Sequence, residues 1–66
     1  MPTVPQRVDP PRGDTVGVWS GPEGTIFVDS GVSLGKVLRR NREVTEVQLP
    51  DGRYVHEPEY WFRRIE

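Results

Sequence analysis

Residues 43–57 read EVTEVQLPDGRYVHE, and this stretch predicts a β-hairpin. Apolar and polar residues alternate on both sides of the PDG sequence at 50–52, as expected of two strands that each bury one face. Proline presets the first corner of a type I turn, aspartate fits the second, and glycine supplies a left-handed residue. A three-residue turn of this kind places Val47 opposite Val55, whereas a two-residue Asp-Gly turn places Val55 opposite Gln48. Side-chain pairing favours the three-residue turn, because it brings the two valines together.

The register of this hairpin divides its side chains between two faces. Val47, Leu49 and Val55 share the face that we expect to be buried. The opposite face carries Glu46, Gln48, Tyr54 and His56. We expect Glu46 and His56 to pair across the strands as a surface contact. The predicted core consists of Val16, Val18, Ile26, Val28, Val37, Val47, Leu49, Val55 and either Phe62 or Trp61.

Short segments rich in β-branched and aromatic residues occupy most of the remaining chain. They predict strands at residues 15–20, 25–29, 35–40 and 61–65. Glycine and proline predict a turn at residues 21–24, a loop at 30–34 and a single turn at 58–60. Residues 33–43 are the nearest candidate for a helix, but they lack the apolar period of about 3.6 residues. The sequence therefore predicts an all-β fold.

The N-terminal segment, residues 1–14, has a different composition and reads MPTVPQRVDPPRGD. Its four prolines interrupt helices and remove hydrogen-bond donors, so we expect an extended or disordered proline-rich arm. The folded domain is then residues 15–66. A core in a domain below about 70–80 residues supplies only about 3–5 kcal/mol of net stability, so a partner surface would help to stabilise it.

The composition excludes several kinds of site. The 66 residues include no cysteine and one histidine, so disulfides and thiolate metal sites cannot form, and we expect neither a metal nor a cofactor. The formal net charge of -1 lacks the basic excess of dedicated nucleic-acid-binding proteins. No apolar run approaches the ~18 residues of a membrane span, and no basic and then apolar leader opens the chain. We therefore expect no membrane partner, and a location in the cytoplasm or within a virion or other large assembly.

The second half of the chain has a familiar order of elements. A strand GKVLRR leads to EVTEVQL, a DG hairpin, RYVHE, a one-turn PEYW segment and a final FRRI strand. This layout resembles the SH3-like small β-barrels, which include KOW and Tudor domains and the C-terminal domain of retroviral-type integrases. The resemblance covers about half of the chain. It implies a single barrel of about five strands with a binding role, and it implies no particular ligand.

Residue patterns that would support catalysis are weak. His56 lies near Glu57 and Glu59 in the sequence and opposite Glu46 in the hairpin, but such pairs are more often structural than proton-transferring. The serines lack a nucleophile motif, and the glycine-containing stretches lack the spacing of a phosphate loop. We expect no catalytic residues and a protein that is not an enzyme. An oligomeric enzyme with a site shared between subunits is the least favoured alternative.

We interpret the chain as an interaction module, an accessory or structural subunit that docks on a partner protein, a large assembly or further copies of itself. Docking would use the arm and one face of the barrel, because aromatic residues and arginines are favoured at interfaces. The predicted partner-binding residues are Val4, Arg7, Val8, Trp19, Arg39, Arg40, Tyr60, Trp61, Arg63 and Arg64. The alternative is a small regulatory protein that binds nucleic acid through an arginine-rich face, provided that residues 35–40 and the last strand lie close together. Glutamates interleaved with the arginines favour the protein partner.

Overall fold

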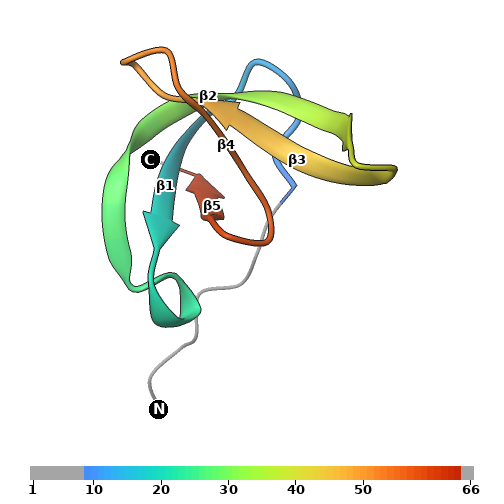
Figure 1. Cartoon of the computed structure of the whole chain (residues 1–66). Helices are drawn as coiled ribbons and strands as arrows, with labels where there is room; N and C mark the ends of the chain where they lie inside the picture. The colour runs from blue at the N-terminus through green and yellow to red at the C-terminus, as the bar shows by residue number, and fades with distance from the viewer. Residues whose placement is uncertain (1–8, 65–66) are drawn as a thin grey trace.

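The computed structural model describes residues 9–64 and shows an all-β fold (Figure 1). The elements are β1 (Thr15–Ser20), the short 3-10 turn η1 (Pro22–Gly24), β2 (Ile26–Arg39), β3 (Arg42–Gln48), β4 (Tyr54–His56) and β5 (Trp61–Arg64). The strands form one antiparallel sheet in the order β4-β3-β2-β1-β5. The sheet is open, with β4 and β5 as its edges.

The hairpin between β3 and β4 has the predicted register. Val47 lies opposite Val55, and the flanking pairs are Gln48 with Tyr54 and Glu46 with His56. The Leu49 amide donates to the Arg53 carbonyl at 2.8 Å, and the Gly52 amide donates to the Leu49 carbonyl at 2.9 Å. Gly52 has a φ of 94°, the left-handed residue that the three-residue turn requires. The register prediction is confirmed.

The predicted loop at residues 30–34 is wrong, because these residues belong to β2. This strand is 14 residues long and curves sharply, so its first half pairs with β1 and its second half with β3 (Figure 1). A Cβ atom at Gly31 would lie 2.5 Å from Val47 Cγ1 and 2.7 Å from the Gln48 carbonyl oxygen. Glycine therefore marks a close approach of two strands here, and it does not interrupt the strand.

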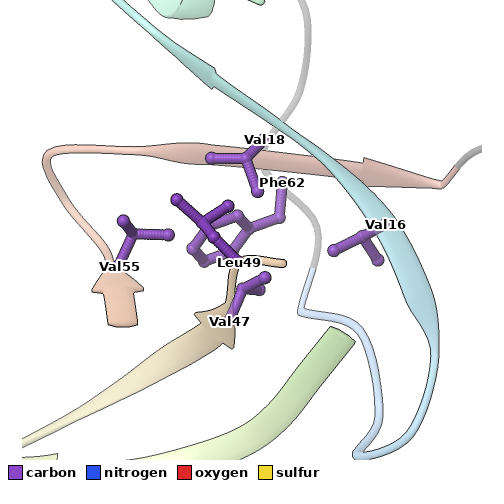
Figure 2. Packing of buried hydrophobic residues seen from close by; sticks show 6 residues of the cluster. All are labelled: Val16, Val18, Val47, Leu49, Val55 and Phe62. Atoms are coloured by element: carbon purple, nitrogen blue, oxygen red, sulfur yellow. The ribbon is translucent and has the colours of Figure 1, made fainter. Parts of the chain in front are cut away.

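The core lies inside the curve of the sheet and is centred on Phe62. Figure 2 shows the side chains of Val18, Leu49 and Val55 gathered around this ring. The buried cluster consists of Val16, Val18, Val47, Leu49, Val55 and Phe62, all of them predicted. Val28 packs against it while only partly buried, and Val37 is half-buried.

Ile26 is a wrong core prediction, since 56% of its surface is exposed. It begins β2 opposite Ser20, at the end of the sheet where the η1 turn lies, and its side chain covers Gly21. Of the two residues predicted for the last core position, Phe62 is buried and Trp61 is half-buried. The two side chains alternate across β5, so they occupy opposite faces of the sheet.

Residues 9–14 contact the sheet. The Ser33 amide and hydroxyl donate to the Asp14 and Pro10 carbonyl oxygens at 2.8 and 2.9 Å, and the Thr45 hydroxyl donates to the Asp9 carboxylate at 3.0 Å. Pro10, Ser33 and Thr45 are buried by these contacts. The Thr45 hydrogen bond, with a smaller effect of Lys36, lowers the pKa of the Asp9 carboxyl.

Within residues 9–64, no helix has the length and apolarity needed to cross a membrane.

Candidate functional site

Three aromatic side chains form a row across three neighbouring strands. Trp19 on β1 lies opposite Phe27 on β2 and opposite Trp61 on β5. The Trp19 and Phe27 rings meet edge to face, with centroids 5.1 Å apart and an interplanar angle of 67°. This is a favourable geometry for an aromatic pair. Because Trp19 and Trp61 alternate with the core residues Val18 and Phe62, the row occupies the outer face of the sheet.

Arg63 adds a cation to this row. Its guanidinium carbon lies 5.3 Å from the centre of the Trp19 ring, which is within the range of a cation–π contact. Trp61 and Arg63 are two residues apart on β5, so they share the outer face of the sheet. Trp19, Phe27, Trp61 and Arg63 are called the aromatic surface below.

The turn that joins β1 to β2 fixes one side of the aromatic surface. Gly24 has a φ of 65°, and a Cβ atom at this residue would lie 2.5 Å from Trp61 Cγ. The indole therefore packs directly on the backbone of the η1 turn, in space that any other residue would fill. The backbone of the η1 turn therefore restricts the position of the Trp61 side chain.

Exposure separates Phe27 from its neighbours. Phe27 has 55% of its surface exposed, whereas Trp19 and Trp61 are half-buried. The Phe27 ring is held by its edge-to-face contact and still has most of its surface exposed to water. Burial of this ring would therefore remove apolar area from water with little further loss of side-chain entropy. Phe27 is absent from the ten predicted binding residues. Alternation between Ile26 and Val28 indicates that it points outward, but its place beside Trp19 depends on the strand pairing.

The structure divides the predicted arginines between distant parts of the sheet. Arg63 and Arg64 lie on the edge strand β5, while Arg39 and Arg40 lie at the end of β2 and in the turn that follows it. Strand β1 separates β2 from β5 in the sheet, so the proximity required for a single arginine-rich face is missing. Arg64 faces Asp14, with the guanidinium and the carboxylate 3.7 Å apart.

Tyr60 does not join the aromatic surface, because it packs against the core and is half-buried. The predicted contacts Val4, Arg7 and Val8 lie outside the described residues. Of the ten predicted binding residues, the fold therefore brings Trp19, Trp61 and Arg63 together on the aromatic surface. It brings Arg39 and Arg40 together at a separate place, beside the β2–β3 turn.

The expected surface pair of Glu46 and His56 is wrong in its side-chain contacts, although their backbones lie opposite each other. Glu46 is 2% exposed, and its carboxylate accepts hydrogen bonds from Arg39 Nε at 3.1 Å and Arg39 Nη2 at 2.7 Å. His56 Nδ1 instead lies 2.6 Å from the Glu57 carbonyl oxygen. Glutamate is buried here because the arginine fork satisfies both carboxylate oxygens.

The described part of the chain contains no group of three or more histidine, cysteine, aspartate or glutamate residues that is placed to hold a metal ion. No family model, curated protein or solved structure matches the chain. The aromatic surface presents apolar area, π faces and one cation, the Arg63 guanidinium over the Trp19 ring.

Proposed function

We propose that this protein is a non-enzymatic interaction module that docks on a partner protein through the aromatic surface and its N-terminal arm. The observation that carries the proposal is Phe27, 55% exposed and held against Trp19 by an edge-to-face ring contact. Aromatic residues and arginines supply most of the energy at protein interfaces, especially where they are grouped and held in place. A role as an accessory or structural subunit of a larger assembly follows from this mode of binding.

We also propose that the sheet belongs to the SH3-like small barrels. The long, curved β2 pairs with β1 along one half and with β3 along the other, which wraps five antiparallel strands around one small core. That arrangement is compatible with the SH3-like order of elements along the chain. The resemblance implies a binding role, and the aromatic surface lies on the outer face of this sheet.

In the proposed complex, Phe27 enters an apolar recess of the partner while Arg63 stays over Trp19 and donates hydrogen bonds to a carboxylate or carbonyl oxygen of the partner. Burial of apolar surface contributes about 25 cal/mol per Å². Residues 9–14 of the arm contact the sheet of the protein itself, so we propose that residues 1–8 add the second contact, which would raise affinity through its proximity to the first.

The test is affinity capture from cells that express the chain, with four forms of the protein compared by quantitative mass spectrometry. Phe27→Ala removes the exposed ring, and Tyr54→Ala is its control, because Tyr54 is 58% exposed and lies on β4 at the opposite edge of the sheet. We expect Phe27→Ala to reduce capture of a protein partner at least about tenfold, as hot-spot residues do, and Tyr54→Ala to leave it unchanged. Deletion of residues 1–8 measures the contribution of the arm. Equal capture by all four forms would contradict the proposal.

The aromatic surface also favours one alternative, which is binding of single-stranded nucleic acid. Bases stack on exposed aromatic rings, and Arg63 would contact a phosphate. The alternative predicts that the logarithm of the association constant for an oligonucleotide falls linearly with the logarithm of the salt concentration. It also predicts that Phe27→Ala and Arg63→Ala both weaken oligonucleotide binding. Absence of oligonucleotide binding at low salt would eliminate it.

A further inference from the structure

A second candidate site lies at the opposite end of the sheet, where the β2–β3 hairpin meets the β4–β5 connection. It is a concave pocket of about 290 Å³. Its lining residues are Arg39, Arg40, Arg42, Val44, His56, Glu57, Pro58 and Glu59. This arginine pocket shares no residue with the aromatic surface, so its function can be tested separately.

Two guanidinium groups of the arginine pocket have no ion-pair partner among the described residues, although two carboxylates, those of Glu57 and Glu59, also line the pocket. Arg39 is paired with the buried Glu46, with 2.7 Å between Nη2 and Oε1. Arg40 and Arg42 form no ion pair with any residue of the described range 9–64. The carboxylate of Glu57, which also lines the pocket, accepts a hydrogen bond from the Thr45 amide at 3.3 Å. Two guanidinium groups therefore remain for a ligand.

The hairpin geometry places these arginines together at an energetic cost. Arg39 and Arg42 lie directly opposite each other on β2 and β3, and like charges in this position are destabilising. Arg40 has a φ of 50°, a left-handed conformation that costs a residue other than glycine about 1–2 kcal/mol. The charge repulsion and the backbone strain both affect residues that line the arginine pocket. An anion bound between the guanidinium groups would offset the charge repulsion.

His56 supplies a further polar group. A carbonyl oxygen only accepts hydrogen bonds, so His56 Nδ1, 2.6 Å from the Glu57 carbonyl oxygen, carries the hydrogen of that contact. In the neutral ring Nε2 then carries no hydrogen, so it can accept a hydrogen bond from the hydroxyl of a monoprotonated phosphate group. A tetrahedral oxyanion has enough oxygen atoms to contact guanidinium groups and an imidazole at the same time.

We infer that the arginine pocket binds the phosphate group of a phosphomonoester. Guanidinium groups match phosphate oxygens in geometry and charge. A nucleic-acid backbone would require a basic track across the surface. Two other arginines of the described range are already engaged, since Arg53 is paired with Asp51 and Arg64 with Asp14. The carboxylates of Glu57 and Glu59, which line the pocket, further disfavour a long polyanion.

The test is an NMR titration of the ¹⁵N-labelled protein at constant ionic strength, with inorganic phosphate, a phosphoserine tripeptide and a short single-stranded oligonucleotide as probes. We expect saturable amide shifts at Arg40, Arg42 and His56 with the first two probes. If the tripeptide binds more tightly than inorganic phosphate, the ligand is a phosphorylated side chain. If the two probes bind equally, the phosphate group alone is recognised. Arg42→Ala should weaken phosphate binding about tenfold, the loss of about one charge-assisted hydrogen bond.

Two further variants make the result decisive. Arg53→Ala removes the same charge outside the pocket and should leave the affinity unchanged. Arg40→Gly should weaken phosphate binding while raising stability, because glycine adopts a positive φ without strain. The inference is overturned by the absence of saturable shifts, by equal weakening in Arg53→Ala, or by an oligonucleotide that binds these residues more tightly than both phosphate compounds.

Discussion

Burial should make the Arg39–Glu46 ion pair much stronger than a surface pair of the same length. Arg39 Nη2 lies 2.7 Å from Glu46 Oε1, and Arg53 Nε lies 2.7 Å from Asp51 Oδ2. The exposed fraction of the carboxylate side chain is 3% for Glu46 and 53% for Asp51. The two pairs therefore differ in their access to water and have the same closest distance. We predict that this difference appears in a pair of double-mutant cycles.

The expected energies follow from the two environments. Removal of one partner from a buried pair costs about 3–5 kcal/mol, because the other charge stays buried without a partner. Arg39 is 48% exposed, so water relieves part of this penalty and about 2–3 kcal/mol is expected for Arg39→Met. Methionine keeps part of the packing of the arginine stem. The coupling energy with Glu46→Leu should be about 2 kcal/mol. The coupling energy of the exposed Asp51–Arg53 pair should be clearly smaller, because water and salt screen both of its charges.

The assay is urea denaturation at neutral pH followed by tryptophan fluorescence, with the free energy of unfolding obtained by linear extrapolation. A domain of this size has about 3–5 kcal/mol of stability, so a stabilising osmolyte is included for all variants. A coupling energy for Arg39–Glu46 no larger than that for Asp51–Arg53 would refute the reasoning. Glu46 would then be buried without depending on its partner.

Three further predictions concern stability. The lowered pKa of Asp9, caused mainly by the Thr45 hydroxyl, means that its ionised form stabilises the fold above the ordinary pKa and that this contribution is lost as pH falls through the lowered pKa. The difference in urea midpoint between wild type and Asp9→Asn should therefore shrink on acidification, and a constant difference would contradict the assignment. Gly31→Ala should lower the free energy of unfolding more than Gly52→Ala does. A Cβ at Gly31 would lie 2.5 Å from β3, whereas a Cβ at Gly52 meets nothing within 4 Å, so that only its φ of 94° causes strain. Equal urea midpoints for the two variants would contradict the close approach at Gly31. Phe62→Ala should cost about 3–5 kcal/mol, comparable to the whole stability, and a cooperative thermal transition in this variant would show that the core is less dependent on Phe62.

Local rules were sufficient to predict the hairpin. Its register depends on three turn residues and on the pairing of Val47 with Val55, all within a short segment. Most of the predicted core was correct for similar reasons, because alternation along each strand assigns residues to faces. Ile26 is the wrong member, since it is exposed, and the buried Val44 is absent from the predicted core. These features require no knowledge of distant contacts.

The errors arose where distant segments meet. Gly31 was interpreted as a loop residue, although the backbone of β3 lies directly against it. Glu46 was placed on the surface, since nothing in its neighbourhood in the sequence indicates that Arg39 reaches it across the hairpin. The aromatic surface depends on β1 pairing with both β2 and β5, so the contribution of Phe27 could not be inferred before the strand order was known.

Site-specific photo-crosslinking tests most directly the claim that the aromatic surface binds a protein. A photoreactive phenylalanine is placed at Phe27 in one sample and at Tyr54 in another, two positions with 55% and 58% of their surface exposed. After irradiation in cells that express the chain, nuclease-treated adducts are identified by mass spectrometry. The proposal predicts a discrete protein adduct from residue 27 that is absent from residue 54. Nucleic-acid adducts at residue 27, or identical products from both positions, would contradict it.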